Sequence, residues 1–365
     1  MKVVLENLTK TFPGRNKKSS VVTAVNNVSF EIPDGNLVGL LGPSGCGKST
    51  TLFMICGLEE PTSGHIYFGE EDVTTLEPEN RGVGVVFQNY ALYPHLNVKK
   101  NIQFPLENFK GKEKLSKEEI NRRVLEAARL VQIENLLERR PKELSGGQQQ
   151  RVAIARALVK MPKVLLLDET LSNLDSRLRL QTREEILRLQ KETKITTVFV
   201  THDQEEAISI SDIIVLMKEG VIYQIGKPQE VYDNPLNLFV AKFLGTPPIN
   251  LFNGKVKDKK LYIGKEAVMD LPNINEDNID VTVGIRPEGF ILDDKGDFTC
   301  KLKRVEVMGR DISVISTNDE CLSGNIRSII ASENSVDTNK ENVRFTLKQN
   351  KVFLFSKENE ERIYF

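Results

Sequence analysis

Apolar positions before about residue 243 follow two alternating patterns. Short apolar runs at 37–41, 82–87, 164–167 and 195–200 predict buried strands. Between these runs, apolar residues recur with the spacing of one helical face. In the helix predicted at 51–58, this face is formed by Leu52, Ile55 and Leu58, and Gly57 marks the helix end. Strands that alternate with helices predict an α/β domain built on a parallel sheet.

The pattern changes twice along the chain. From about 89 to 156, helical periodicity dominates, which predicts a helical subdomain inserted in an α/β domain spanning 1–242. After Phe243 the helical signal fades, and a Gly-Thr-Pro-Pro turn at 245–248 marks a boundary. Beyond it, short alternating segments separated by polar turns predict a β-barrel or sandwich over 243–365. Further polar loops are predicted at 13–20 and 110–114.

A phosphate-binding motif follows the first buried strand. The stretch 42–50 fits G-x-x-x-x-G-K-S/T between a predicted strand and a predicted helix. Glycines let backbone N–H groups turn inward, and the positive end of the following helix points at the same place. Lys48 adds a charge for the outer phosphates, and the Ser49 hydroxyl is suited to Mg²⁺. The alternative, a glycine-rich turn without a ligand, fits this context less well. The motif is Gly42-Pro43-Ser44-Gly45-Cys46-Gly47-Lys48-Ser49-Thr50.

Polar side chains follow three of the buried runs. Gln88 comes after the run at 82–87, and His202 comes after the run at 195–200. The carboxyl ends of parallel strands form the edge where ligands bind in such sheets, so both side chains are site candidates. The other two histidines, His65 and His95, are interpreted as surface or structural residues.

Two adjacent carboxylates, Asp168 and Glu169, follow the run at 164–167. Burying charge without a partner is costly, so a functional role is favoured. Asp168 is suited to Mg²⁺ binding, and Glu169 is suited to general-base work. The alternative is that one carboxylate caps Ser172 or a neighbouring helix.

Two further residues have open interpretations. Ser145 lies in a second glycine turn, 144–148, which opens a predicted helix. It is either an N-cap or part of an anion site, and taken alone the N-cap is favoured. Phe12 either stacks on a nucleotide base or fills a hairpin core, and taken alone the core is favoured.

Composition narrows the class of protein. The chain has 365 residues, 39% hydrophobic and 28% charged, which predicts two or three soluble domains. Its net charge of −1 disfavours a nucleic-acid-binding protein. Its four cysteines form no C-x-x-C pair, and no signal peptide or membrane-spanning run is recognisable. The sequence therefore predicts a cytoplasmic protein with reduced thiols.

The order of the motifs resembles that of the ATPase subunit of an ATP-binding-cassette (ABC) transporter. More narrowly, the chain is similar to the bacterial carbohydrate-importer ATPases typified by the maltose importer subunit. Segments at 245–252 and 284–290 resemble that branch and its OB-like, β-barrel regulatory domain. The other matching motifs are the phosphate loop, the run at 81–96, LSGGQ at 144–148, LLLDE at 165–169, SNLD at 172–175 and THDQ at 201–204.

The resemblance implies ATP and Mg²⁺ as ligands. It implies that Phe12 stacks on adenine, Gln88 links Mg²⁺ and the attacking water to the helical insert, and Glu169 polarises that water. It also implies that His202 contacts the γ-phosphate. Across a dimer interface, the γ-phosphate of the other subunit would meet Ser145, Gly146, Gly147 and Gln148, while Asp175 crosses the interface.

The implied assembly is an importer at the cytoplasmic face of the bacterial membrane. Its partners would be a second ATPase copy or close paralogue, two transmembrane permease subunits and an extracytoplasmic solute-binding protein. A ligand or regulatory protein would act on the C-terminal domain. The expected cargo is a sugar or oligosaccharide. Glycerol phosphate, a polyamine or an inorganic anion is the alternative, and a non-transport ABC ATPase is disfavoured by the single LSGGQ and the near-neutral charge.

Two positions depart from the family pattern. Thr170 stands where most relatives have proline after the catalytic glutamate, which removes a rigid φ angle near the proposed base. Phe12 stands where most relatives have tyrosine, which keeps the stacking face and loses the hydroxyl.

Overall fold

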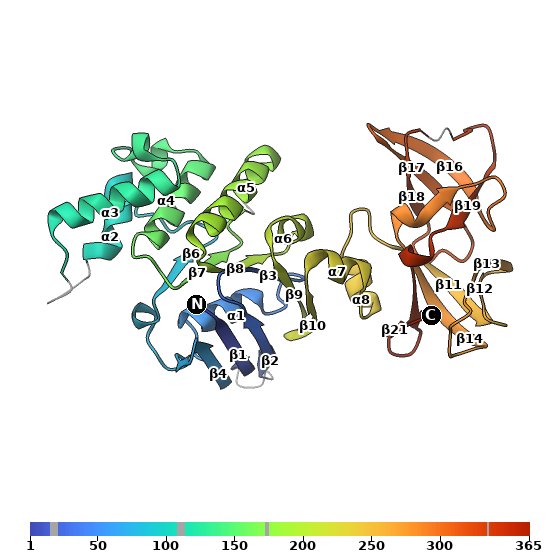
Figure 1. Cartoon of the computed structure of the whole chain (residues 1–365), viewed down its shortest axis with the longest axis horizontal. Helices are drawn as coiled ribbons and strands as arrows, with labels where there is room; N and C mark the ends of the chain where they lie inside the picture. Colours follow the sequence, from blue (N-terminus) through green and yellow to red (C-terminus); the bar gives the residue numbers. More distant parts are fainter. Residues whose placement is uncertain (15–20, 108–113, 172–174, 334–335) are drawn as a thin grey trace. The chain divides into compact units, whose positions relative to one another are not determined.

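The computed structural model describes residues 1–14, 21–107, 114–171, 175–333 and 336–365. It divides into two compact units, Met1–Pro228 and Gln229–Phe365, which are described separately (Figure 1). The predicted domain boundary at 242/243 stays a prediction. Most of the polar loops predicted at 13–20 and 110–114, and all of Ser172, lie outside the described residues.

A six-stranded sheet in the order β10-β9-β3-β8-β7-β6 forms the centre of the first unit. All its neighbouring strands run parallel except β10, which pairs antiparallel with β9. The predicted α/β architecture is therefore confirmed, and the carboxyl ends of five parallel strands lie along one edge. The strands are β3 (Leu37–Leu41), β6 (Val83–Val86), β7 (Val164–Asp168), β8 (Thr196–Thr201), β9 (Ile213–Lys218) and β10 (Val221–Gly226).

A second, antiparallel sheet in the order β2-β1-β4-β5 shares a hydrophobic core with the central sheet. Its strands are β1 (Val3–Phe12), β2 (Val22–Ile32), β4 (Ser63–Phe68) and β5 (Glu71–Asp72). Helix α1 (Lys48–Cys56) contributes Leu52 and Ile55 to this core. The helix ends where Gly57 adopts a left-handed conformation, with φ 84°. Leu58 therefore lies beyond the helix and is 51% exposed, so its predicted place on the buried face was wrong.

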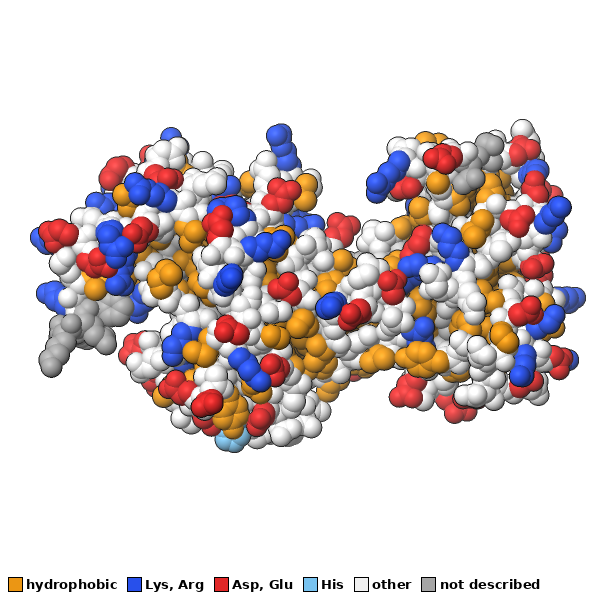
Figure 2. All heavy atoms as spheres, in the orientation of Figure 1, with side chains coloured by type: hydrophobic (Ala, Val, Ile, Leu, Met, Phe, Trp, Pro, Cys, Tyr) orange, Lys and Arg blue, Asp and Glu red, His pale blue; other side chains and the backbone are white. Residues whose placement is uncertain are grey.

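Helices α2 (Val98–Glu107), α3 (Lys117–Leu130) and α4 (Gly146–Leu158) pack on one another (Figure 1). Their buried faces share a core with α5 (Ser176–Thr193) and with one face of the central sheet. Helix α6 (Gln204–Ile210) follows β8 and packs against β3 and β8. On the face shown in Figure 2, Lys and Arg side chains are interspersed with Asp and Glu, in keeping with the net charge of −1. Within the described residues, no helix combines the length and apolar character needed to cross a membrane.

The second unit is dominated by two antiparallel sheets around one core. Their orders are β13-β12-β11-β14-β20-β21 and β15-β19-β16-β17-β18. Inside the core, edge-to-face or tilted ring contacts join Phe252, Phe290, Phe298 and Phe345. This nearly closed arrangement confirms the predicted all-β, barrel-like domain. The strands are β11 (Asn250–Lys257), β12 (Lys260–Ile263), β13 (Glu266–Asp270), β14 (Ile279–Ile285), β15 (Phe290–Leu292), β16 (Phe298–Met308), β17 (Asp311–Thr317), β18 (Ile326–Ala331), β19 (Asn342–Leu347), β20 (Val352–Ser356) and β21 (Arg362–Ile363).

Two short helices, α7 (Pro228–Asp233) and α8 (Leu238–Phe243), precede these strands. The fully buried guanidinium of Arg286 donates hydrogen bonds to the carbonyls of Tyr232, Ala241 and Leu244. It also stacks 3.9 Å from the centre of the Tyr232 ring. One buried cation thus joins the helical segment to the β-strands of this unit.

Candidate functional site

The loop before α1 places its backbone too close to neighbouring segments for side chains at two glycines. A Cβ at Gly42 would lie 2.1 Å from the Met217 carbonyl oxygen, and one at Gly47 would lie 2.4 Å from that of Ala24. Both glycines have positive φ angles, 155° and 104°, which are strained for other residues. The tight loop leads directly into the N-terminus of α1, an arrangement that favours anion binding.

The Lys48 side chain is 4% exposed and folds back over this loop. Its Nζ donates hydrogen bonds of 2.9 Å to each of the Gly42 and Pro43 carbonyls. Nζ also lies 3.8 Å from Cys46 Sγ. Burial raises the pKa of the Cys46 thiol, while the Lys48 charge acts in the opposite direction. The motif therefore concentrates positive charge at the loop and keeps a neutral thiol beside it.

The next residue connects the loop to the central sheet. Ser49 Oγ donates a 3.0 Å hydrogen bond to Asp168 Oδ1 at the end of β7. Asp168 is 8% exposed, and this burial raises the pKa of its carboxyl, with the hydrogen bond from Ser49 acting against the rise. Adjacent hydroxyl and carboxylate oxygens are ligands that suit Mg²⁺.

No group of three or more His, Cys, Asp or Glu side chains in the described part of the chain could hold a metal ion alone. Mg²⁺ commonly binds proteins through one or two side chains together with substrate phosphates. The Ser49–Asp168 pair fits that kind of shared site.

Glu169 lies beside two other predicted residues. Its Oε2 is 3.4 Å from Gln88 Nε2 and 3.5 Å from His202 Nδ1. The three side chains come from the ends of β6, β7 and β8, as their positions after buried runs predicted. Glu169 itself has φ 43°, and its backbone N–H donates to the Val200 carbonyl over 3.0 Å. This left-handed conformation occurs at the residue that directly follows β7.

A hydrogen-bonded network supports the segment around His202. Thr201 Oγ1 donates to the buried carboxylate of Glu206 over 2.6 Å and accepts from the Asp203 N–H over 3.0 Å. Asp203 caps α6, and Arg179 of α5 contacts both Asp203 and Glu206, at 3.3 and 3.5 Å. Burial raises the pKa of Glu206, while the hydrogen bond from Thr201 lowers it. Both neighbours of His202 are therefore fixed.

Sequence reasoning missed this network and a second support. Arg81, 3% exposed, donates to the carbonyls of Met54 and Ile55 at the end of α1, at 2.7 and 3.0 Å. It thereby holds the helix that carries the phosphate loop. The capping role of Asp203 was recognisable from an aspartate placed directly before a helix. No local signal distinguishes Arg81 from a surface arginine.

The remaining predicted residues form a second group. Ser145 accepts a 3.4 Å hydrogen bond from the Gln148 N–H, and Gln148 Oε1 accepts a 3.0 Å bond from the Ser145 N–H. This capping box at the start of α4, where Gly146 is the first helical residue, confirms the N-cap interpretation of Ser145. An anion-binding role stays a prediction.

Helix α5 approaches this capping box closely. A Cβ at Gly147 would lie 2.9 Å from Leu178 Cδ1, so another residue at this position would require the Leu178 side chain to shift. Asp175 caps α5 by accepting a 3.0 Å hydrogen bond from the Leu178 N–H. The rest of the predicted 172–175 motif lies outside the described residues.

Phe12 is the last residue of β1 and is half-buried. Lys10 Nζ lies 5.0 Å from the centre of its ring. The choice between a stacking and a packing role for Phe12 therefore stays open. His65, by contrast, has an exposed partner, Asp72 Oδ2 at 3.0 Å, in keeping with a structural role.

Comparison with known proteins gives a consistent set of relatives. The family described as "ABC transporter" matches residues 25–172. The sn-glycerol-3-phosphate import ATP-binding protein UgpC of Psychromonas ingrahamii is 43% identical over 321 residues, which cover 87% of this chain and 83% of that protein. UgpC of Yersinia pseudotuberculosis is 46% identical over 288 residues, 78% of each chain.

Solved structures resemble the first part of the chain. The dimeric post-hydrolysis state of the ATP-binding cassette MJ0796, bound to ADP and Pi, has a TM-score of 0.54 and 34% identity. The match covers 62% of this chain and 98% of that one. The structure of cbiO1 from Clostridium perfringens, part of an ABC transporter complex, has a TM-score of 0.56 and 31% identity, covering 64% and 90% of the two chains.

Proposed function

Because the chain belongs to the ABC transporter family, as an ATP-binding subunit of an importer, we propose that the edge at β6, β7 and β8 hydrolyses Mg²⁺-ATP. The observation that carries this proposal is the contact of both Gln88 and His202 with Glu169 Oε2. Glu169 directly follows Asp168, whose carboxylate is paired with Ser49. Phosphate-binding, metal-binding and water-orienting groups are thereby within one small region.

Each residue has a distinct role in this proposal. The loop 42–50 and Lys48 bind the phosphates, Ser49 and Asp168 hold Mg²⁺, and Gln88 adds a ligand from the next strand. Mg²⁺ neutralises charge on the phosphate oxygens. Glu169 orients the attacking water and accepts its proton, and His202 contacts the γ-phosphate. Catalysis then depends mainly on positioning and charge stabilisation.

The second group of residues supports a shared site. We propose that Ser145, Gly146, Gly147 and Gln148 bind the γ-phosphate held by a second copy, that Asp175 lies at the interface, and that Phe12 stacks on adenine. The N-terminus of α4 is suited to a phosphate, because its backbone N–H groups and dipole favour negative charge. The related cassette MJ0796 is described as dimeric.

The proposed cargo is sn-glycerol 3-phosphate. The relatives that cover most of this chain are named for the import of that compound, which supports the alternative cargo of the sequence analysis better than a sugar or oligosaccharide. The partners are two transmembrane subunits and an extracytoplasmic binding protein, with this subunit at the cytoplasmic face of the membrane.

The test is cargo-dependent ATP hydrolysis. The subunit is purified from its own cells with the membrane subunits that co-purify with it, and the complex is reconstituted in proteoliposomes with the binding protein. We expect the loaded binding protein to stimulate ATPase activity with sn-glycerol 3-phosphate, and glycerol and maltose to have no effect. Stimulation by maltose alone would contradict the cargo. A complex that carries Glu169→Gln shows how much hydrolysis comes from this subunit.

A further inference from the structure

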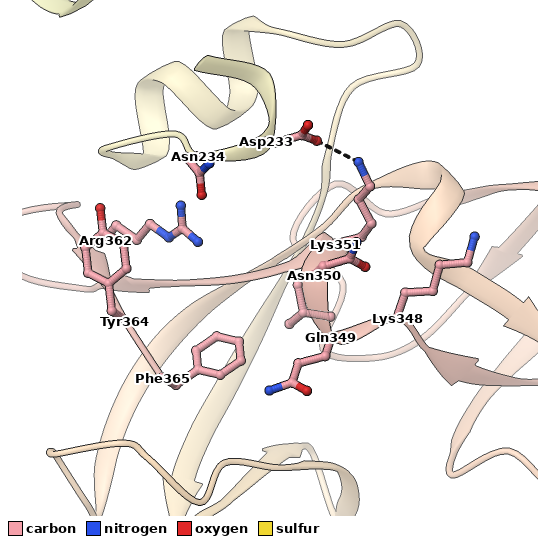
Figure 3. Close-up of a pocket in the computed structure, with 10 residues that line it drawn as sticks. Asp233, Asn234, Lys348, Gln349, Asn350, Lys351, Arg362, Tyr364 and Phe365 are labelled. Carbon is pink, nitrogen blue, oxygen red and sulfur yellow. Dashed lines mark hydrogen bonds and ion pairs between the residues drawn. The ribbon is translucent and has the colours of Figure 1, made fainter. Parts of the chain in front are cut away.

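The second unit contains a pocket of about 690 Å³ that the proposed ATPase cycle does not use. It lies among Asp233 and Asn234 at the end of α7, the turn at 348–351 and the strand end at Arg362–Phe365 (Figure 3). The volume falls within the range of about 300–1,000 Å³ that is usual for organic ligands. It is large for an inorganic phosphate or sulfate ion alone.

Arg362 is the unusual residue in this pocket. Its guanidinium carbon lies 4.9 Å from the centre of the Phe353 ring and 4.7 Å from that of Tyr364. Its Nε and Nη1 are buried and have no hydrogen-bond partner among the described residues. Burial also lowers the pKa of this guanidinium, because the charged form loses water. Buried donors without partners are costly, and an acceptor supplied by a ligand would remove that cost.

Two of the basic side chains that line the pocket, Arg362 and Lys348, form no ion pair with a carboxylate among the described residues. Lys351 Nζ contacts Asp233 Oδ1 at 2.7 Å and Glu288 Oε1 at 3.4 Å, so its charge is balanced. Lys348 Nζ donates to the Glu288 carbonyl and points away from the pocket centre (Figure 3). Figure 3 shows the side chains of Arg362 and Asn234 converging on one side of the space. An acidic group at that point would meet the donors of Arg362.

The opposite side of the pocket offers apolar surface. The Phe365 ring lies between Arg362 and Gln349, and Val352 also lines the pocket (Figure 3). Tyr364, which covers one face of the Arg362 guanidinium, is 61% exposed. We expect movement of this exposed side chain to give a ligand access to the Arg362 donors.

We propose that this pocket binds a small organic anion. Its carboxylate or phosphate group accepts hydrogen bonds from Arg362, and its apolar part lies against Phe365. The inference goes beyond the proposed ATPase role and does not depend on the cargo. It assigns the second unit a ligand site formed entirely by its own residues.

The test is calorimetric titration of the full-length protein with its nucleotide site saturated by Mg²⁺-ADP, which keeps acidic probes out of the phosphate loop. The probes are benzoate and phenyl phosphate, with benzyl alcohol as the uncharged ring and inorganic phosphate as the bare anion. We expect at least one of the two aromatic anions to bind about tenfold or more tightly than benzyl alcohol and inorganic phosphate, given the strength of charge-assisted hydrogen bonds. Failure of both aromatic anions to bind, or equal binding of benzyl alcohol, overturns the proposal.

Two variants locate the binding. Arg362→Gln should weaken the aromatic anion about tenfold or more, because it removes the charged donor. Asn234→Asp should weaken it as well, because it adds a negative charge where the acidic group binds. The matched control is Arg310→Gln, an arginine with a 94% exposed side chain in the same unit. Circular dichroism checks that each variant folds. If Arg362→Gln does not fold, the affinity of Asn234→Asp decides whether the ligand binds in this pocket. Unchanged affinity in a folded pocket variant, or equal loss in the control, contradicts the site.

Discussion

Ser49 Oγ and Asp168 Oδ1 lie 3.0 Å apart, although 119 positions separate the two residues in the chain. The hydrogen bond joins the first turn of α1 to the carboxyl end of β7. Each partner lies at the end of an element with a buried face, so packing of the helix on the sheet determines their distance. The proposed metal site is therefore formed by the fold before any ligand binds.

Replacing Asp168 with asparagine should separate metal binding from stability. Turnover of Mg²⁺-ATP should fall about 100-fold or more, because a charged ligand to the metal is lost. The thermal midpoint of the nucleotide-free protein should rise at neutral pH. Burial raises the pKa of Asp168, so the fold favours its neutral form, and this residue reduces stability as pH rises through the raised pKa. Asparagine is neutral throughout.

Calorimetry between about pH 4, near the usual pKa of a carboxyl, and about pH 8 checks the sign of this pH dependence. The midpoint of Asp168→Asn minus that of the wild type should grow with pH. Asp319→Asn, at an exposed aspartate, is the control. A difference that shrinks with rising pH would contradict the effect assigned to burial.

Glu169→Gln should keep ATP binding and lose about 100- to 10,000-fold in turnover, the usual contribution of a general base. The amide preserves the size of the side chain but cannot accept the proton of the water. We expect ATP to hold this variant as a dimer in size-exclusion chromatography, because hydrolysis no longer reopens it. Glu184→Gln, at an exposed glutamate of α5, should behave as wild type. Turnover near the wild-type rate would remove Glu169 from the role of base.

Two inactive variants should restore activity when they are mixed. Lys48→Ala disables the phosphate loop, and Ser145→Arg disables the capping box proposed to close the opposite site. A heterodimer of the two has one site with both defects and one with neither. A 1:1 mixture should therefore hydrolyse ATP clearly faster than either variant alone, as measured by phosphate release. If mixed dimers form and activity does not rise, the sites are not shared.

The site residues could be predicted because their signals are local. Gln88, Asp168 and His202 each follow a buried apolar run, and parallel strands bring such ends to one edge. The phosphate loop is likewise defined by adjacent residues. The contacts that support the site are not local. Arg81 reaches α1 across 26 and 27 positions of sequence, and the residue type alone gives no indication of that partner.

In the second unit, too, the sequence predicted the strands but not the contacts between distant segments. Its alternating segments predicted β-structure, but the pocket beside Arg362 depends on Asp233 and Asn234 meeting the much later segments 348–352 and 362–365. Leu58 illustrates the opposite error: its helical spacing suggested burial, yet the left-handed Gly57 ended the helix first. Cargo could not be derived from local patterns, because no motif of the ATPase unit reports on it. The proposed cargo therefore depends on the names of the relatives alone.

Thr170, directly after Glu169, has a buried hydroxyl whose cost to stability can be tested. It is fully buried, and its Oγ1 has no hydrogen-bond partner among the described residues. A buried hydroxyl without a partner costs about 1–3 kcal/mol. Thr170→Val keeps the shape and removes that cost, so the free energy of unfolding of the nucleotide-free protein should rise by about 1 kcal/mol. The thermal midpoint should rise by about 2–4 °C.

Thr196→Val is the matched control, because Thr196 is equally buried but its hydroxyl is fully used. Its Oγ1 donates to the Met1 carbonyl over 2.7 Å and accepts from the Gly35 N–H over 3.0 Å. This variant should lose about 1 kcal/mol, since the same substitution leaves two partly buried groups, the Met1 carbonyl and the Gly35 N–H, without this partner. If both variants lose stability equally, the Thr170 hydroxyl has a partner in solution.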